Sequence, residues 1–325
     1  MGDIPKPVSR SEVRLFYQRL GLEQLPRLLG FVDRDAGSET FGCADRYYWH
    51  YKLHDTANAR FQEICLPLAL AYCHAEGMPY YQNPQVLSWI QAAVDFWAAL
   101  RHQNGSVDEI YPFEQSFCAT SFSTMAVCET LLLMQKAGKP LAMPDLSATG
   151  RWLSRKRRPE VANQMAAAAV ALLDLALLTG QDEFLEAADK KIDALLRGQD
   201  VEGFFPEYGG ADTGYLSLTL SCLQIFLARR LQESLQAALG RGGRFLEGRL
   251  DQYGRSDPLL NSRRTGYHYP CGLAAFAPAA LGRHWQGVSQ GQAAHPGWLD
   301  DRYCVGLVSD YLRLAWELEI AADDC

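Results

Sequence analysis

The segment from residue 201 to residue 218, VEGFFPEYGGADTGYLSL, places carboxylates and phenols among four glycines. Glu207 and Asp212 are five residues apart, and two carboxylates that flank a glycosidic bond can hydrolyse it, one as acid and one as base or nucleophile. Tyr208 and Tyr215 offer ring faces that stack on sugars, and a phenol can also transfer a proton. We expect Glu207, Asp212 and Tyr208 to be catalytic and Tyr215 to bind substrate. The alternative is that the carboxylates cap helix ends.

A second segment, NSRRTGYHYP from residue 261, combines arginines, tyrosines and a histidine. Removing the proton next to a uronate carboxylate requires a group that neutralises the carboxylate, together with a base and an acid of tunable pKa. Arginine suits the first task, and histidine and tyrosine suit the others. We expect Arg263 and Arg264 to bind substrate and Tyr267 and His268 to transfer protons. The chemistry would be β-elimination or epimerisation at a uronate.

A third segment, ADRYYWHYKLHD from residue 44, is dense in functional side chains. His50 and His54 are four residues apart, as zinc ligands on a helix are, but the glutamate of H-E-x-x-H is absent, so no metal site is predicted. We expect this segment and the residues after it to line a groove. The candidates are Asp45 and His50 as catalytic residues and, for substrate binding, Tyr47, Trp49, Asn58, Arg60 and Gln62.

Two acidic segments give further substrate-binding candidates, Asp108 and Glu114 in the first and Asp300 and Asp301 in the second. Carboxylates near a helix N-terminus stabilise the helix by about 0.3 to 1 kcal/mol, so capping is the alternative for all four. A basic run, residues 155–158, is typical of a solvated helix end; a rim that receives an anionic substrate is the alternative.

The composition indicates a globular protein: of 325 residues, 48% are hydrophobic and 21% are charged. The net charge of -7 argues against a surface for nucleic acid or anionic lipid. The chain has no nucleotide-binding glycine motif, and no cofactor is predicted. The most hydrophobic stretch, residues 165–178, is too short to span a bilayer. The predicted partner is therefore a small molecule or oligosaccharide, with no nucleic acid and no membrane span.

The N-terminal residues lack the apolar stretch of a secretory signal, and the nine cysteines are scattered without a C-x-x-C pair. We expect a cytoplasmic protein whose cysteines are reduced core residues. The oligomeric state is not indicated by the sequence.

Helical periodicity dominates the elements that must position these residues. Apolar residues recur at three and four positions in several stretches, and no long stretch alternates with period two, so little or no sheet is expected. Residues 165–178 are apolar all round, whereas residues 182–197 have one apolar stripe. A buried helix followed by an amphipathic one is the unit of a double ring. The helical stretches are 61–73, 86–100, 122–134, 165–178, 182–197 and 216–231.

Six polar, aromatic-rich segments recur at intervals of roughly 40 to 60 residues, close to the length of a helical hairpin. This spacing predicts an all-α fold, an (α/α)₆ toroid that forms one domain over residues 1–325, with residues 1–40 as a helical lead-in. The six segments would gather at one end of the ring and line a central cleft.

The hairpin NQMAAAAVALLDLALLTGQDEFLEAADKKIDALL, followed by EGFFPEYGG, resembles the (α/α)-toroid domains of carbohydrate-active enzymes. The most similar are the helical parts of heparinase II/III-like lyases and glucuronyl C5-epimerases. The resemblance covers residues 40–310 and implies a carbohydrate-active enzyme of the lyase or epimerase type. The chain has no room for the β-sandwich that follows the toroid in heparinase II/III-like enzymes, and no family catalytic residue is carried over.

Two other functions fit a helical barrel. A terpene cyclase-like enzyme would use aromatic faces to stabilise carbocations, although neither D-x-D-D nor D-D-x-x-D is present. A non-catalytic helical-repeat protein would bind a partner on an open superhelix whose first and last helices are far apart.

Overall fold

The helices begin and end where the sequence supplies caps. In the computed structural model, which describes residues 9–323, Asn83 accepts a hydrogen bond from the Gln85 N–H before α5, with Pro84 in the first turn. The Ser116 hydroxyl accepts from the Ala119 N–H at the start of α6. Gly180 ends α8 with a φ of 70°, a left-handed conformation that glycine adopts readily.

The described residues form an all-α protein without a β-strand; the only strand-like pairing among them is a pair of isolated bridges at Glu207. All six predicted helical stretches coincide with helices, except that residues 61–64 form a 3-10 helix and that residues 100, 230 and 231 lie just beyond the helix ends. The elements are α1 (Arg10–Leu22), α2 (Leu25–Leu29), α3 (Arg46–Trp49), η1 (Ala59–Ile64), α4 (Cys65–His74), α5 (Pro84–Ala99), α6 (Phe117–Lys136), α7 (Ser147–Arg155), α8 (Ala162–Thr179), α9 (Asp182–Gly198), α10 (Thr213–Arg229), α11 (Glu233–Arg249), η2 (Pro258–Leu260), α12 (Pro270–Phe276), α13 (Pro278–Ser289), η3 (Pro296–Trp298) and α14 (Asp301–Asp323).

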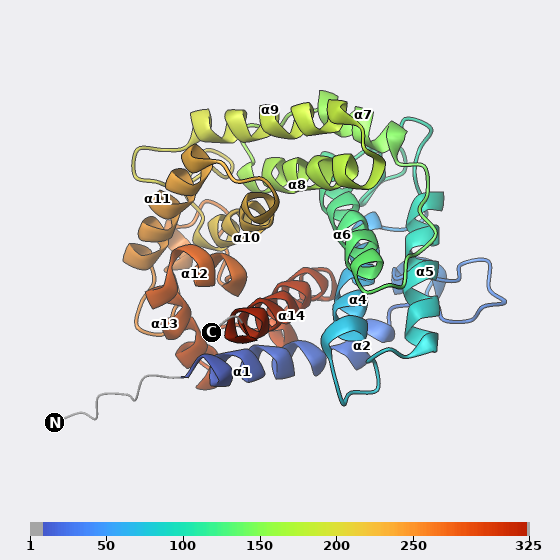
Figure 1. Ribbon diagram of the computed structural model, residues 1–325, viewed down its shortest axis with the longest axis horizontal. Helices are drawn as coiled ribbons and strands as arrows, with labels where there is room; N and C mark the ends of the chain where they lie inside the picture. Colours follow the sequence, from blue (N-terminus) through green and yellow to red (C-terminus); the bar gives the residue numbers. More distant parts are fainter. Residues whose placement is uncertain (1–8, 324–325) are drawn as a thin grey trace.

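The helices lie in two layers around a centre (Figure 1). The inner helices α4, α6, α8, α10, α12 and α14 each contact the next, and α14 contacts α4. The helices α5, α7, α9, α11 and α13 pack outside the inner helix that precedes each of them, and α1 packs along α14. The predicted contrast is confirmed: α8 is buried over most of its length, whereas α9 has one buried stripe. Apolar side chains such as Leu68, Ile90, Phe184 and Phe226 fill the space between helices.

The predicted N-terminal lead-in contains α1 and α2, and its first eight residues lie outside the described part of the chain. Because α1 packs along α14, it is part of the helical assembly. Two inner helices, α6 and α8, are long and apolar enough to cross a membrane by length and composition alone. Their apolar windows are 78% and 72% buried inside the protein, as expected of core helices.

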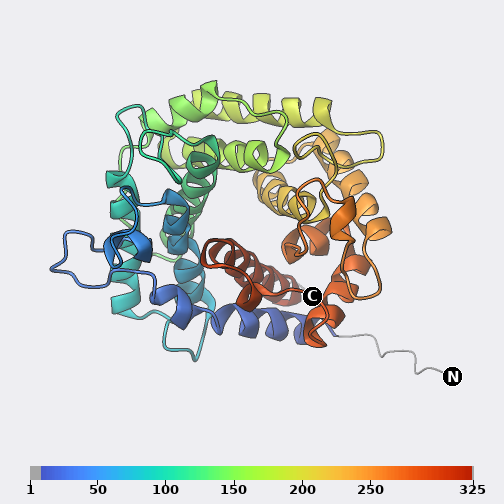
Figure 2. The ribbon, with the colours of Figure 1, turned by 180° about the vertical axis from the view of Figure 1, so that it is seen from behind.

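The inner helices all run in the same direction, because an outer helix returns the chain between each of them and the next. Their N-termini therefore gather at one end of the assembly, the end that faces the viewer in Figure 2. Each helix N-terminus carries a partial positive charge and free backbone N–H groups. This end of the molecule is consequently suited to anions.

Candidate functional site

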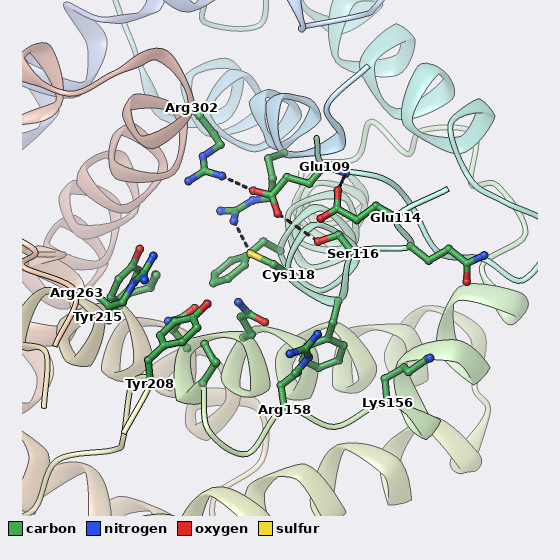
Figure 3. Close-up of a pocket in the computed structure, with 18 of the residues that line it drawn as sticks. Glu109, Glu114, Ser116, Cys118, Lys156, Arg158, Tyr208, Tyr215, Arg263 and Arg302 are labelled. Atoms are coloured by element: carbon green, nitrogen blue, oxygen red, sulfur yellow. Dashed lines mark hydrogen bonds and ion pairs between the residues drawn. The ribbon is translucent and has the colours of Figure 1, made fainter. Parts of the chain in front are cut away.

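A cavity of about 600 Å³ opens at the end where the inner helices begin. Its walls combine basic, aromatic and acidic side chains from six segments of the chain, and Figure 3 shows most of them. The basic residues are Arg60, Lys156, Arg157, Arg158, Arg263 and Arg302; the aromatic ones are Phe117, Phe122, Trp152, Tyr208, Tyr215, Tyr269 and Tyr303; the carboxylates are Glu109 and Glu114.

Basic side chains outnumber carboxylates in this cavity, although the whole chain carries a net charge of -7. Residues from the first turns of α6, α8, α10 and α14 line it, so the positive ends of these helices add to the side-chain charges. A concave site with one sign of charge concentrates ligands of the opposite sign. The charges of the cavity wall therefore suit an anionic ligand.

Two of the arginines already have carboxylate partners. Arg60 forms an ion pair with the buried Glu63, and its Nη1 lies 3.0 Å from Cys118 Sγ. Arg302 forms an ion pair with Glu109, whose other oxygen accepts a hydrogen bond of 3.2 Å from the Ser116 hydroxyl. Because the Glu109 carboxylate is engaged on both oxygens, it is not a free acid or base.

Glu114 and Asp108 hold the loop before α6 in place. One Glu114 carboxylate oxygen accepts hydrogen bonds from three consecutive backbone N–H groups, of residues 109, 110 and 111. Asp108 accepts from the N–H of Phe113 and Gln115, which both have positive φ, and from His102. Burial alone would raise the pKa of Asp108, but these hydrogen bonds lower it. Both carboxylates stabilise a strained loop, and only Glu114 lines the cavity.

Tyr208 and Arg263 meet on the opposite side of the cavity from Glu114 (Figure 3). The Arg263 guanidinium carbon lies 4.5 Å from the centroid of the Tyr208 ring, and Arg263 forms no ion pair among the described residues. Tyr208 is 52% exposed and has a φ of 53°, held by a hydrogen bond of 2.8 Å from its N–H to the Glu160 carbonyl. Burial raises the pKa of its phenol. Tyr208 is therefore protonated at neutral pH.

Tyr215 and Tyr303 form a second phenol group in the cavity wall. Their hydroxyl oxygens are 3.3 Å apart, and the Arg302 guanidinium carbon lies 4.3 Å from the Tyr303 ring centroid. Burial, followed by the hydrogen bond to Tyr303, raises the pKa of Tyr215 well above its usual value. Tyr215 therefore keeps its proton and can donate it in a hydrogen bond to the Tyr303 oxygen.

Glu207, predicted to be catalytic, is fully buried and does not line the cavity. Its Oε1 accepts a hydrogen bond of 2.7 Å from the Asn163 N–H in the first turn of α8, and its Oε2 has no partner. Burial raises the pKa of this carboxyl to about 8, despite the opposing hydrogen bonds from Asn163. Backbone bridges from Glu207 to Val161 and Gly210 make it a tie between the 201–212 segment and α8.

Asp212 is buried and caps α10, the alternative that the sequence left open. One oxygen accepts from the Tyr215 N–H at 3.0 Å, and the other accepts from the N–H groups of Arg263 and Thr265 at 3.0 and 3.3 Å. Asp212 does not line the cavity, but it fixes the backbone of two residues that do, Tyr215 and Arg263.

The candidates between residues 45 and 62 mostly have structural contacts. Asp45 is buried, caps α3 through the Tyr47 N–H and also accepts from the Asn58 N–H. The Gln62 side chain bonds backbone groups of residues 42, 44 and 93. Asn58 caps η1, and the Trp49 indole donates to the Phe31 carbonyl. Of this group only Arg60 lines the cavity; the residues outside it are Asp45, Tyr47, Trp49, His50, Asn58 and Gln62.

The remaining candidates lie around the cavity rather than in its wall. His268 is buried with Nε2 3.2 Å from Thr213 Oγ1, and burial lowers its pKa to about 4. Asp300 accepts from backbone N–H groups at the start of α14, and Asp301 forms an ion pair of 2.7 Å with Arg27. Five predicted residues line the cavity and, apart from Asp108 and the group between residues 45 and 62, seven do not. The five are Arg60, Glu114, Tyr208, Tyr215 and Arg263; the seven are Glu207, Asp212, Arg264, Tyr267, His268, Asp300 and Asp301.

Several cavity residues were not selected from the sequence. Arg302 and Tyr303 directly follow the two aspartates that were chosen, and the basic run 156–158 was interpreted as a helix end. Trp152, Tyr269 and Glu109 are further members of this group. A signal existed for the basic run, because its alternative was an anionic-substrate rim. A signal also existed for Tyr269, which belongs to the segment NSRRTGYHYP, but none existed for Trp152, a largely buried aromatic residue.

No group of three or more His, Cys, Asp and Glu side chains suited to a metal ion occurs among residues 9–323. His54, one of the two histidines spaced like zinc ligands, bonds Asp45 through Nδ1 at 3.1 Å. The eight cysteines in the described part of the chain are all free, and Cys325 lies outside it. No known protein family and no curated protein sequence matches this chain.

Proposed function

We propose that the two helical layers form an (α/α)₆ toroid. Six inner helices that contact one another in a closed series, each with an outer partner, support this arrangement. In such a ring the loops that lead into the inner helices surround one central opening. The cavity lies at that end, in agreement with the position of substrate clefts in ring-shaped helical enzymes.

The proposed function is that of a carbohydrate-active enzyme that abstracts a proton from a uronate-containing saccharide, as a lyase or an epimerase. The observation that carries it is a cationic cavity in which Arg263 has no ion pair and lies against the Tyr208 phenol. An unpaired guanidinium can neutralise the uronate carboxylate, which makes the neighbouring C–H bond more acidic. Asn163 and Gln164 also line the wall, and the Gln164 amide is a further donor for an anionic ligand.

Proton transfer would use the phenols. In its phenolate form, Tyr303, which can accept a hydrogen bond from Tyr215 beside Arg302, would take the proton from the carbon next to the carboxylate and become a neutral phenol. In elimination, the electron pair forms a C=C bond to the next carbon, the bond from that carbon to the glycosidic oxygen breaks, and Tyr208 gives its proton to this oxygen. In epimerisation, Tyr208 would return a proton to the first carbon from its other face. The raised pKa of Tyr208 keeps the phenol protonated, as a proton donor must be before the transfer.

Glycoside hydrolysis receives less support. It requires an acid and a free carboxylate that flank the scissile bond. Glu109 is paired with Arg302 and Ser116, and Glu114 accepts three backbone hydrogen bonds. The two carboxylates in the cavity are thus already engaged, and the buried Glu207 and Asp212 lie outside its wall.

The two other functions also receive less support. A wall with six basic side chains would repel a carbocation, which a terpene cyclase must stabilise. An open superhelix would separate its first and last helices, whereas α1 packs along α14.

The test is incubation with a panel of acidic polysaccharides built from galacturonate, mannuronate, guluronate and glucuronate. Elimination creates a C=C bond conjugated to the carboxylate, seen as new ultraviolet absorbance, and epimerisation in heavy water places deuterium next to the carboxylate. We expect one of these signals, lost in Tyr208→Phe and Arg263→Ala but kept in Tyr111→Phe, whose ring is exposed outside the cavity wall. New reducing ends without absorbance would establish hydrolysis instead, and no binding or turnover on any member would reject the proposal.

A further inference from the structure

The segment between α7 and α8 carries three consecutive basic side chains into the cavity wall, Lys156, Arg157 and Arg158, here called the basic strap. In Figure 3 Lys156 and Arg158 lie on the far side of Tyr208 from Arg263. The strap therefore contributes a second positive region to the cavity, separate from the Arg263 guanidinium. The proton-abstraction chemistry proposed above does not require it.

The strap charges are largely unpaired. Among the described residues, Lys156 and Arg157 form no ion pair, and Arg158 reaches Glu160 only at 3.5 Å in an exposed contact. Arg60 and Arg302 in the same cavity, by contrast, each pair with a glutamate. Like charges on three neighbouring residues repel one another, so their concentration at a cavity is unfavourable without a ligand of opposite charge.

A buried lysine behind the strap fixes its backbone. Lys191 on α9 is 3% exposed, and its Nζ donates a hydrogen bond of 2.7 Å to the Lys156 carbonyl. The ammonium also lies 5.5 Å from the centroid of the Phe117 ring, another residue of the cavity wall. Burial, followed by the charge of Arg157, lowers the pKa of Lys191 to about 8. A buried amine costs free energy, and here its single hydrogen bond goes to the strap.

The strap is also joined to the turn that carries Tyr208. The Tyr208 N–H donates to the Glu160 carbonyl at 2.8 Å, and the Ala162 N–H donates to the Pro206 carbonyl at 3.2 Å. Trp152 lies beneath the strap, with Lys156 Nζ 5.3 Å from its ring. A cationic segment beside an aromatic ring suits an acidic sugar, whose C–H face can pack on the ring while its charge meets the amines.

We propose that the basic strap is a second anionic subsite, so that the substrate is an acidic oligosaccharide or polysaccharide with a second negative group on a sugar unit away from the reacting uronate. Lys191 is its positioning residue. This inference rests on the proposed function, because it assigns the reacting unit to the region of Tyr208 and Arg263. The second group is a carboxylate or a sulfate ester, since both accept hydrogen bonds from Lys and Arg.

The test measures binding by calorimetry for acidic oligosaccharides of one to six units from the panel above, in native, methyl-esterified and sulfated forms. We expect wild-type affinity to rise with length. The combined change Lys156→Ala and Arg157→Ala should weaken binding of the longer chains at least about tenfold and leave a single uronate unaffected. Arg263→Ala should weaken both. If methyl esterification removes the rise of affinity with chain length, the second group is a carboxylate. If affinity rises with length only for the sulfated chains, the second group is a sulfate ester.

The positioning role has its own matched pair of variants. Lys191→Met removes the amine that holds the strap and should reduce the preference for longer chains, whereas Lys190→Met removes an exposed lysine that pairs with Glu186 and should change nothing. If Lys191→Met fails to fold, the exposed strap variant still decides the subsite. A wild-type protein that binds no acidic saccharide rejects both the function and the subsite. If the wild type turns over an acidic saccharide and the strap variant still prefers longer chains, the subsite is rejected while the proposed function stands.

Discussion

The buried carboxyl of Glu207 makes a prediction that needs no substrate. Its pKa is raised from 4.5 to about 8, so forming the charged group in the folded protein costs about 5 kcal/mol relative to the unfolded chain, at about 1.4 kcal/mol per pKa unit. Below pH 4.5 the group is protonated in both states, and the cost is absent. Between pH 4.5 and 8 the folded state binds more protons, so this group lowers the free energy of unfolding as the pH rises. Above pH 8 the group is charged in both states, and it lowers the free energy of unfolding no further.

Glu207→Gln keeps the shape of the side chain and the oxygen that accepts from the Asn163 N–H, but it cannot ionise. Urea unfolding of both proteins at pH 5 and pH 9 measures the effect, since other titrating groups are common to both and cancel in the difference. We expect the stability of Glu207→Gln relative to wild type to increase by several kcal/mol, up to about 5, between these pH values.

Glu202→Gln is the matched control, because Glu202 lies in the same segment but is exposed and pairs with Arg249 at 3.0 Å. Its stability relative to wild type should hardly change with pH. Parallel pH dependence in wild type and Glu207→Gln would show that Glu207 ionises freely in the folded protein, and the assignment of a buried, neutral carboxyl would be wrong.

Four further substitutions test the scaffold of the site and the charge of its cavity. Asp212→Ala removes the cap of α10 and should lower the free energy of unfolding by about 1 to 3 kcal/mol, measured by urea unfolding. Gly243→Ala in α11 should lower the free energy of unfolding by about 1 to 3 kcal/mol, because the new Cβ would lie 1.8 Å from a carbonyl oxygen of α12. Gly248→Ala in the same helix is the control: its Cβ would meet nothing within 4 Å, and the free energy of unfolding should rise by about 0.5 to 1 kcal/mol. Glu109→Gln removes the negative charge that pairs with Arg302, so acidic oligosaccharides should bind more tightly, as measured by calorimetry. Weaker binding would contradict this expectation.

The helices could be predicted from the sequence because local signals determine them. The apolar periodicity of residues 182–197 and the glycine at position 180 are properties of neighbouring residues, and α9 and the end of α8 follow them. The contrast between inner and outer helices is likewise visible in how many faces of a helix are apolar.

The site was predicted only in part, for a physical reason. Where inner helices begin side by side, many backbone N–H groups need acceptors, and carboxylates such as Glu207 and Asp212 supply them. In a sequence, such a group of capping carboxylates looks the same as a group of catalytic carboxylates. Arg302 and Tyr303 were passed over because the sequence does not show which side of a helix start faces the cavity, and chemistry alone favoured the aspartates before them.

The packing of α1 along α14 has a consequence for how the protein is made. These helices are separated by nearly the whole chain, so their contact closes a very long loop, and contacts of this kind form late in folding. Arg302 and Tyr303 stand in the first turn of α14 and reach the cavity only when this helix has docked. During synthesis the nascent chain therefore lacks a complete pocket until α14 has emerged from the ribosome, and partly folded chains do not yet have the full site.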